Sequence, residues 1–321
     1  EVPNRVASIV RLGSLLNYPE FSKSSNLTIP LGRDVAGEPI FTSIAKMPHM
    51  LIAGSTGSGK SVAIHSLIVS LLYKNSPATL RFIMIDPKKV ELSIYDGIPH
   101  LLSPVITEGK RAIAALKFAI QEMERRYELL LEAGKRDIVG YNKDRDNDVL
   151  PYMVVVIDEL ADLMNTFGRE VESATVRLAQ MARATGIHLI VSTQRPSVEV
   201  ITGLIKANIT SRIALQVASQ VDSRTILDLA GAEKLLGGGD MLFISADYSK
   251  PKRIQGNFID EEEISKVVEF INTENRGSID DTLGEEMGES LDKPNLYSMD
   301  GGDDDDLYDD ALDVVIRARK A

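Results

Sequence analysis

The residues with the clearest chemical potential form a glycine-rich run that ends in lysine and serine. Residues 54–61 read GSTGSGKS and fit the pattern G-x-x-x-x-G-K-[ST]. The glycines let successive backbone N–H groups face phosphate oxygens, while the lysine reaches the β and γ phosphates and the serine hydroxyl binds Mg²⁺. The sequence therefore predicts a site for ATP and Mg²⁺ built from Gly54, Ser55, Thr56, Gly57, Ser58, Gly59, Lys60 and Ser61.

Two acidic residues, Asp158 and Glu159, directly follow the apolar run YMVVVI. Open parallel sheets bind ligands at the carboxyl ends of their strands, where this pair would lie. Asp158 is placed to hold the Mg²⁺ shell together with Ser61. Glu159 suits polarising a water for in-line attack on the γ phosphate, which favours hydrolysis over transfer to a second substrate.

Further polar residues occur where other reacting groups are expected. The next apolar run ends in Ser192, Thr193 and Gln194, and either Gln194 or Thr193 fits a side chain that touches the γ phosphate or its water. The intervening helical segment carries Arg177 and Arg183, one of which could act as an arginine finger on a neighbour's γ phosphate. A surface charge pair is the alternative interpretation of these arginines.

The elements that must position these residues are visible as apolar, β-branched runs alternating with helical segments. This alternation predicts an α/β fold with a mainly parallel sheet covered on both faces. Apolar residues from Ile113 to Leu131 recur at helical spacing, and Gly134 follows as a C-cap. The predicted strands are His49–Ala53, Leu80–Asp86, Tyr152–Asp158, Ile187–Thr193, Ser211–Ala218 and Asp240–Ser245.

Composition divides the chain into four regions. Residues 1–44 are polar and turn-rich and predict a small N-terminal α/β module with a strand near Leu27–Leu31, and residues 45–272 form the predicted P-loop domain. Residues 273–306 are rich in Gly, Asp, Glu, Ser and Asn and predict a disordered acidic linker. Residues 307–321 regain helical periodicity and are expected to begin a further domain.

Charge and composition exclude several classes of protein. The net charge is −11, but from Glu274 onward there are 15 acidic and five basic residues, so the body carries about −1 and its charge says little about the ligand. No cysteine is present, which excludes disulfides and thiolate metal sites, and the four histidines lack metal-ligand spacing. No apolar run is long enough for a membrane helix, so we expect a cytoplasmic setting. The chain starts without Met, so an excised piece of a longer protein is expected.

Beyond these patterns, the chain resembles the motor of the FtsK/SpoIIIE DNA translocases over nearly its whole length. The segments that carry the resemblance include AKMPHMLIAGSTGSGKS (45–61), RFIMIDPKKVELSIYDGIPHLL (81–102), VIDELADLM (156–164), LAQMARATGIHLIVSTQRPSVEVITGLIKANITSRIALQVAS (178–219) and SRTILDLAGAEKLLGGGDML (223–242). The resemblance implies a RecA-like β domain, a small preceding α domain and a homohexameric ring around double-stranded DNA. It also implies a winged-helix γ domain, of which residues 307–321 are the opening.

The resemblance also implies roles for individual residues. Arg183 would act in trans, and Arg195 and Arg224 would face DNA. Gln220 departs from the family, which often places a lysine there, so one DNA contact is in doubt. Without the resemblance, the residues themselves offer only basic side chains that flank loops able to point into a channel, namely Arg195, Lys206, Arg212 and Arg224.

The expected function is therefore ATP-driven translocation of double-stranded DNA in chromosome segregation and cell division. The resemblance further implies division or recombination partners bound through the missing γ domain. It also implies a membrane-anchored parent, with this motor at the cytoplasmic face of the inner membrane. Two alternatives remain open: a HerA-like or conjugation coupling-protein motor, and a non-motor nucleotide-binding module that assembles at division sites.

Overall fold

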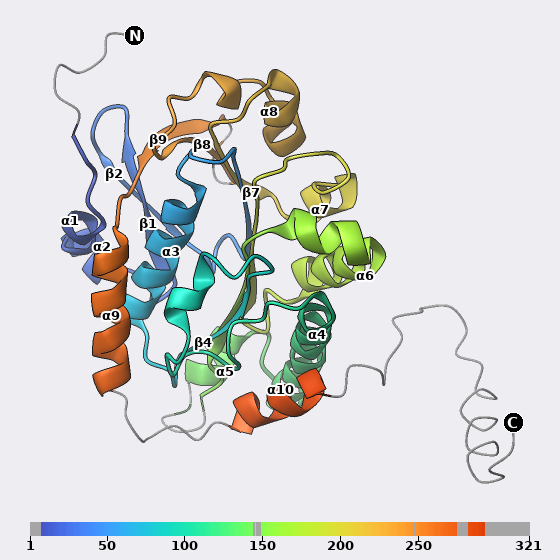
Figure 1. Cartoon of the computed structure of the whole chain (residues 1–321). Helices are drawn as coiled ribbons and strands as arrows, with labels where there is room; N and C mark the ends of the chain where they lie inside the picture. Colours follow the sequence, from blue (N-terminus) through green and yellow to red (C-terminus); the bar gives the residue numbers. More distant parts are fainter. Residues whose placement is uncertain are drawn as a thin grey trace, which may run out of the picture.

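The computed structural model describes residues 8–143, 145, 149–246, 248, 250–274 and 282–292. Within these residues a single nine-stranded sheet runs through the molecule, with helices on both faces (Figure 1). The strand order is β2-β1-β9-β8-β7-β3-β6-β5-β4. All nine strands therefore belong to one hydrogen-bonded framework that connects the N-terminal part with residues near 256.

Five strands form the parallel centre of the sheet. Their side chains are almost all buried, which explains why the sequence shows continuous apolar runs rather than alternation. The pairs β3–β6, β3–β7, β4–β5 and β5–β6 are all parallel. The bounds are β3 His49–Ala53, β4 Leu80–Ile85, β5 Tyr152–Ile157, β6 Ile187–Thr193 and β7 Ser211–Leu215.

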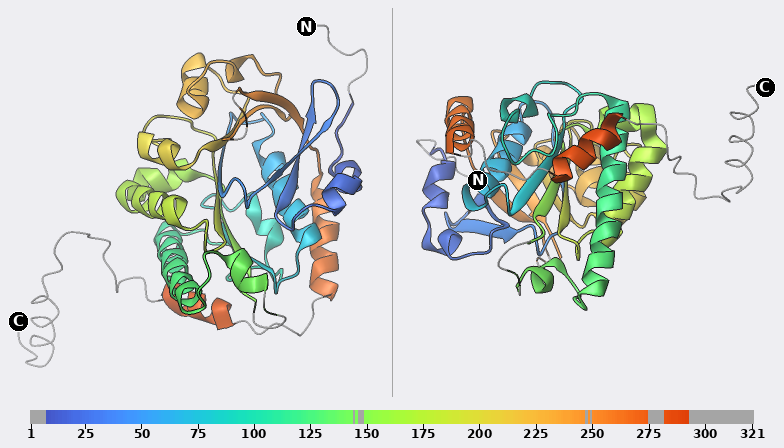
Figure 2. Two further views of the ribbon diagram at one scale, coloured as in Figure 1. Left: turned by 180° about the vertical axis from the view of Figure 1, so that it is seen from behind. Right: turned by 90° about the horizontal axis from the view of Figure 1, so that it is seen from below.

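Helices cover the two faces of this centre, as expected for an α/β fold. Alternate residues of each strand point to opposite sides, so Leu51 and Ile83 belong to one core cluster while Ile52 and Phe82 belong to the other. The first face is covered by α4 (Gly109–Glu132), α6 (Leu160–Met181) and α10 (Thr282–Asp292), and the second by α3 (Lys60–Lys74) and α9 (Glu261–Glu274) (Figure 2).

The four remaining strands extend the sheet beyond β7 in antiparallel fashion. They are β1 (Thr28–Asp34), β2 (Pro39–Ser43), β8 (Asp240–Ile244) and β9 (Lys252–Gly256). β9 pairs with both β8 and β1, so it joins the predicted N-terminal module to the P-loop domain. The predicted boundary at residue 44 falls between β2 and β3, and the division into separate domains stays a prediction.

Short elements complete the described chain. The helices α1 and α2 lie beside β1, while α7 and α8 flank β7, and two 3₁₀ turns occur in the connections. Their bounds are α1 Leu12–Leu16, α2 Pro19–Ser22, η1 Leu92–Tyr95, α5 Ile138–Lys143, α7 Gly203–Asn208, α8 Gln220–Leu227 and η2 Ala232–Lys234.

The expected strands and the long amphipathic helix are present, whereas β9 and α10 were not expected. Gly134 has φ +63, as its predicted C-cap role requires. The predicted disordered linker is wrong for residues 282–292, because α10 is helical there and buries Met287 and Leu291. Its glycines and acidic residues hide this short apolar stripe. The predicted start of a γ domain at 307–321 lies outside the described residues.

Candidate nucleotide-hydrolysis site

The glycine-rich loop lies between the central strand β3 and the N-terminus of α3, which begins at Lys60. Gly57 and Gly59 have φ of +80 and +103, a conformation that side chains with a Cβ rarely adopt. A Cβ on Gly59 would also lie 2.6 Å from the backbone nitrogen of Gly239. The loop therefore needs these glycines to curl, and the curl directs backbone N–H groups and the helix N-terminus to one place.

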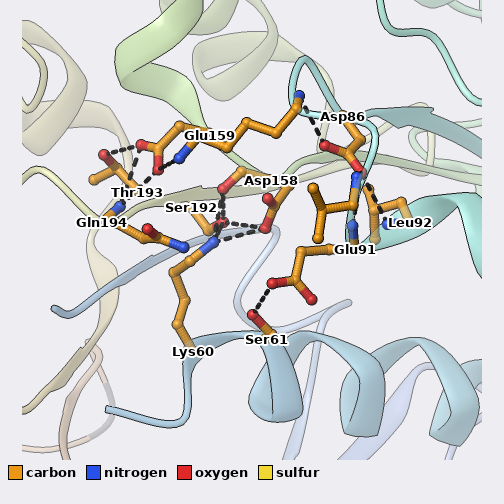
Figure 3. Close-up of polar contacts among 12 residues, drawn as sticks. Lys60, Ser61, Asp86, Glu91, Leu92, Asp158, Glu159, Ser192, Thr193 and Gln194 are labelled. Carbon is orange, nitrogen blue, oxygen red and sulfur yellow. Dashed lines mark hydrogen bonds and ion pairs between the residues drawn. The ribbon is translucent and has the colours of Figure 1, made fainter. Parts of the chain in front are cut away.

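Lys60 follows the loop after β3 and contacts the carboxyl ends of β5 and β6. Its Nζ donates to Asp158 Oδ1 at 2.6 Å, to the Asp158 carbonyl at 2.9 Å and to Ser192 Oγ at 3.1 Å (Figure 3). The lysine side chain is 3% exposed, so the ion pair with Asp158 is shielded from water. The predicted phosphate-binding lysine and the predicted metal ligand are thus in direct contact, and Ser192 is an additional acceptor that sequence reasoning left without a role.

Asp158 retains acceptor capacity for a cation. Its Oδ2 is buried and has no hydrogen-bond partner among the described residues. Burial raises the pKa of Asp158, and the nearby Lys60 ammonium acts in the opposite direction. The described residues contain no group of three potential metal-ligating side chains. Mg²⁺ needs fewer, since it is commonly held by one or two protein oxygens with waters and phosphates, so Asp158 and Ser61 fit it.

Ser61 contacts a residue that the sequence did not single out. Its Oγ donates to Glu91 Oε1 at 2.6 Å, and Glu91 in turn lies 3.6 Å from His65 Nε2. The His65 ring lowers the pKa of Glu91 to about 2 against partial burial, and the Ser61 hydroxyl acts in the same direction. Glu91 therefore remains ionised beside the hydroxyl predicted to bind Mg²⁺. No sequence pattern marks it, because its position depends on the loop after β4.

That loop is shaped by Asp86 at the end of β4. The Asp86 carboxylate accepts from the backbone nitrogens of Lys88, Val90, Glu91 and Leu92 (Figure 3). Four backbone donors on one buried carboxylate fix the path of the chain. The loop consequently presents Glu91 to Ser61 and Lys88 to Glu159, two contacts on opposite sides of the site.

Glu159 is completely buried and held by several donors. Thr193 Oγ1 donates to Oε1 at 2.6 Å, Lys88 Nζ to Oε2 at 3.0 Å, and the Gln194 backbone nitrogen lies 3.2 Å from both oxygens. Burial acts to raise the pKa of Glu159, but the hydrogen bonds from Thr193, Lys88 and Gln194 outweigh it, and the pKa lies below its usual value. The carboxylate is therefore ionised, as a base that activates water must be.

Gln194 lies at the mouth of the site, as its place after β6 predicts. Its Oε1 accepts from Thr56 Oγ1 of the glycine-rich loop at 3.2 Å. Because β6 lies between β3 and β5, its carboxyl end falls between the loop and the acidic pair. The structure therefore brings Gln194, Lys60, Asp158 and Glu159 together. Their separate roles in catalysis stay predictions.

A cavity of about 610 Å³ opens beside the glycine-rich loop. Its wall includes a second glycine-rich turn at Gly238 and Gly239, whose Gly239 nitrogen donates to the Ser58 carbonyl at 2.9 Å. The far end is lined by Ile9 and Phe258, with the Arg11 guanidinium 5.5 Å from the Phe258 ring centre. Sequence reasoning missed these residues. The GGG run at 237–239 was the available signal, since it adopts positive φ throughout.

Arg183 lies away from this cavity. It lines a separate groove of about 500 Å³ with Arg136, Tyr152 and His188, near the amino ends of the central strands. The glycine-rich loop follows the other end of β3, and five strand residues span roughly 15 Å. Arg183 is thus remote from the site in its own chain. Arg177, the other candidate finger, instead pairs with Glu124 of α4.

The predicted DNA-facing arginines are both exposed. The Arg195 side chain is 63% exposed, with Nη1 3.9 Å from Asp162 Oδ1, and Arg224 lies on the outer side of α8. The expectation that Arg212 flanks a channel is wrong. This side chain is buried and donates to the Asp228 carboxylate and to three backbone carbonyls, because it fastens α7 and α8 to β7.

Lys206 shares that anchor. Its Nζ donates to Asp228 Oδ1 at 2.7 Å, so Lys206 and Arg212 neutralise the same carboxylate. Asp228 itself has φ +59 at the C-cap of α8. Lys206 therefore belongs to a structural cluster, and of the four basic residues named from the sequence Arg195 and Arg224 are the two that are exposed.

A parallel sheet with a glycine-rich loop after its central strand, and an acidic pair ending a strand two positions away, defines a P-loop ATPase with a RecA-like core. A model of the FtsK/SpoIIIE family matches residues 14–198. The chain belongs to the FtsK/SpoIIIE family.

Individual relatives agree with this assignment. The chain is 50% identical over 331 residues to the DNA translocase FtsK of Halalkalibacterium halodurans, covering all of the chain and 41% of that protein. It is 52% identical over 324 residues to the DNA translocase FtsK of Caldanaerobacter subterraneus, again over the whole chain and 44% of that protein. The chain thus spans about two fifths of the length of the curated relatives it matches.

Solved structures show the same architecture. The conjugation coupling protein TcpA of pCW3, in a monomer form with ATPγS, superposes with a TM-score of 0.71 at 29% identity, over 83% of this chain and 75% of that one. The type VII secretion ATPase EccC of Thermomonospora curvata also reaches 0.71, at 24% identity, over 83% of this chain and 34% of that one, and shows the fold alone. No helix in the described part of the chain is long and apolar enough to cross a membrane.

Proposed function

We propose that this chain is the ATP-hydrolysing motor of a DNA translocase. The observation that carries the proposal is the cluster in which Lys60, Asp158 and Glu159 converge at the carboxyl ends of β3 and β5. A site arranged for ATP hydrolysis agrees with the names of the relatives that are 50% and 52% identical to this chain, which are DNA translocases. Double-stranded DNA is the proposed substrate, and chromosome segregation and cell division are the proposed setting.

Each residue of the site has a separate role in the proposed hydrolysis. Backbone N–H groups of residues 54–59 and the α3 N-terminus hold phosphate oxygens, and Lys60 exchanges its contact with Asp158 for one with phosphate. Ser61 and Asp158 Oδ2 would hold Mg²⁺, which supplies charge neutralisation at the phosphates when bound. Glu159 accepts the proton of the attacking water, and Gln194 orients that water from its place beside Thr56.

The position of Arg183 supports a ring. Because it lies near the amino ends of the strands, it can approach a γ phosphate only in a neighbouring copy. We therefore propose that Arg183 acts in trans in a homohexamer. Partners bound through a γ domain and a membrane-anchored parent with a cytoplasmic motor are parts of the same proposal, as is the division into α and β domains near residue 44.

The exposed arginines supply the proposed DNA contacts. Arg195 follows the γ-phosphate-facing end of β6 directly, and Arg224 lies on α8. Contacts of this kind with phosphates read charge rather than sequence, which suits a motor that moves along any duplex.

One other function is favoured by a specific observation. The similarity to the coupling protein TcpA covers most of both chains, so a conjugation motor is the second candidate. The identity to that protein is 29%, against 50% and 52% for the DNA translocases. Both candidates are motors, so both predict that DNA stimulates ATP turnover, whereas a non-motor assembly module does not.

The test measures nucleotide binding and steady-state ATP turnover with and without a linear DNA duplex. Wild type should be stimulated by DNA. Lys60→Ala should lose productive ATP binding, while Glu159→Gln should bind ATP and lose turnover by at least about 10²-fold. Arg177→Ala, which removes an exposed arginine from the same fold, serves as the control. Turnover that ignores DNA would support the non-motor module, and unchanged turnover in Glu159→Gln would refute the role of Glu159.

A further inference from the structure

Four side chains of alternating charge connect the surface to the buried acid Glu159. In order they are Arg195, Asp162, Lys88 and Glu159, with side-chain exposures of 63%, 27%, 33% and 0%. Asp162 Oδ1 lies 3.9 Å from Arg195 Nη1, and Asp162 Oδ2 lies 3.9 Å from Lys88 Nζ. Lys88 Nζ is 3.0 Å from Glu159 Oε2. We name this set the charge chain.

The inner end of the charge chain is surrounded by three donors. A carboxylate offers about four lone-pair positions. Those of Glu159 meet Thr193 Oγ1, Lys88 Nζ and the shared Gln194 nitrogen, which contacts both oxygens. A water that is to be activated needs one of these positions. A water therefore competes with these donors for Glu159, and the release of one donor would give it a stronger hydrogen bond.

Lys88 is the donor best placed to leave. The Gln194 contact comes from the backbone, and Thr193 belongs to a buried strand. Lys88 lies instead on the loop fixed by Asp86, next to Lys89, which holds φ +59 without being glycine. Its ammonium already has a second carboxylate, Asp162, one turn along α6 from Glu159. A small movement of the ammonium toward Asp162 would leave the shared Gln194 nitrogen as the one remaining donor to Glu159 Oε2 among the described residues.

The outer end of the charge chain determines how strongly Asp162 attracts Lys88. While Arg195 faces Asp162, it neutralises part of that carboxylate's charge. When Arg195 turns to a DNA phosphate, Asp162 is left with Lys88 as its nearest cation among the described side chains. The backbone offers a parallel link, since the Arg195 nitrogen donates to Thr193 Oγ1 at 3.1 Å, and this same hydroxyl donates to Glu159.

We propose that Asp162 and Lys88 are positioning residues that couple DNA contact at Arg195 to release of Glu159. Without DNA, Lys88 occupies Glu159 and slows hydrolysis. With DNA on Arg195, Asp162 draws Lys88 away and the carboxylate accepts a hydrogen bond from water. The coupling to DNA rests on the proposed function, whereas the restraint of Glu159 by Lys88 does not require DNA.

The first arm of the test addresses Lys88 in the absence of DNA. Lys88→Met removes the ammonium but keeps a chain of similar length, and basal ATP turnover should rise roughly threefold to tenfold, a small part of the about 10²- to 10⁴-fold that a general base supplies. Lys88→Arg keeps the charge and should raise basal turnover less than Lys88→Met does. Unchanged or lower basal turnover in Lys88→Met would overturn the restraint, whatever DNA does.

The second arm addresses Asp162 with a linear DNA duplex. Asp162→Asn should bind DNA as tightly as wild type or more tightly, because an anion beside Arg195 is lost. Its ATP turnover at saturating DNA should nevertheless stay near the basal rate measured without DNA. Asp162→Glu should restore stimulation, and Glu170→Gln, which changes an exposed carboxylate farther along α6, should leave it intact. Weaker DNA binding with normal maximal stimulation in Asp162→Asn would overturn the coupling.

The two arms separate this inference from the proposed function. If DNA stimulates neither wild type nor any variant, the proposed function and the coupling fail together, and the Lys88→Met basal rate still decides the restraint. If DNA stimulates wild type and Asp162→Asn equally, the proposed function stands and the coupling fails.

Discussion

Lys60 shows how a single side chain can organise a site. Its ammonium contacts Asp158 and Ser192 from two different strands, so a buried charge is compensated by several acceptors at once. Removing one partner of a buried ion pair leaves an uncompensated charge, which is more costly than the pair itself is worth. Substitutions at Lys60 are therefore expected to affect folding as well as phosphate binding, and they are best judged beside a stability measurement.

The first residue-scale prediction concerns DNA affinity. Replacing Arg195 or Arg224 with Ala should weaken binding about equally for any duplex sequence and flatten the salt dependence by about one unit of slope per contact, because fewer counterions are released. Binding would be titrated at several salt concentrations on two unrelated sequences. Arg177→Ala, whose arginine pairs with Glu124, is the control. A sequence-specific loss with an unchanged slope would contradict the assignment.

The second residue-scale prediction concerns Arg183. Subunits carrying Arg183→Ala and subunits carrying Lys60→Ala should each be inactive alone and regain part of their turnover when mixed, because some interfaces then combine an intact Lys60 with an intact Arg183. An arginine finger is worth about 10³- to 10⁵-fold in rate, so partial recovery should be measurable. Verified mixed assemblies without any recovery would count against action in trans.

Some of the site could be predicted from the sequence and some could not. Lys60, Asp158, Glu159 and Gln194 were placed correctly as neighbours because each follows a strand of one parallel sheet, and strand ends share an edge. Glu91 and Lys88 escaped prediction, along with the turn at 237–239. Their positions depend on loop conformation, for example on the four backbone hydrogen bonds to Asp86. Loop conformation leaves no periodic pattern in the sequence.

At the scale of elements, β3 and β6 carry a pair of buried histidines at their amino ends. His188 Nδ1 donates to the Pro48 carbonyl at 3.0 Å, and the Leu189 nitrogen donates to His49 Nδ1 at 3.1 Å. Burial lowers the pKa of His49 to about 3 and that of His188 to about 4. Both rings are therefore neutral in the folded protein near neutral pH, and the unfolded chain binds protons more readily.

The sign of this linkage gives a prediction. Below the ordinary histidine pKa the unfolded state gains protons that the folded state does not. The free energy of unfolding therefore decreases as the pH is lowered from about 6.5 to about 4. For His188 the loss amounts to about 3 kcal/mol at most. The free energy of unfolding of His188→Gln should therefore drop less than that of wild type between about pH 8 and about pH 5. Tyr152→Phe perturbs the stacked neighbour without removing a histidine and is expected to keep the wild-type pH dependence.

The helix α10 gives a second prediction at this scale. Met287 and Leu291 are 0% and 3% exposed and belong to the same core cluster as α4 and α6. Met287→Ala should therefore lower the free energy of unfolding by about 2 to 5 kcal/mol, the range for large-to-small changes in a core. Urea unfolding would measure it, with Met181→Ala as the control because Met181 is 44% exposed. Truncation after Glu274 should destabilise comparably, and a loss below about 0.5 kcal/mol in Met287→Ala would show that α10 is not needed.

For the molecule as a whole, the distribution of function follows the two ends of the parallel strands. The glycine-rich loop and its cavity lie at the carboxyl ends, and Arg183 lies near the amino ends, so each side of a subunit would supply one half of the proposed catalytic interface. The fold class, the central strands and the helical layers were accessible from the alternation of apolar runs, and so were β8 and the strand near Leu27–Leu31. The antiparallel extension as a whole was not accessible, since β9 carries Lys252, Arg253 and Gln255 among its five residues and shows no apolar run.

That extension has a consequence for how the protein is made. β1 pairs with β9, with Gly32 opposite Gly256, and a Cβ on Gly32 would lie 2.0 Å from the Gln255 carbonyl oxygen. Ribosomes add about 5 to 20 residues per second, so β1 leaves the tunnel roughly 10 to 45 s before its partner strand exists. Throughout that interval one edge of the β1–β2 hairpin is unpaired, and exposed edges recruit other strands. Nascent chains on one messenger RNA would thus expose the same unpaired strand edge to each other. The nascent protein is therefore expected to depend on holdase chaperones until residue 256 has emerged.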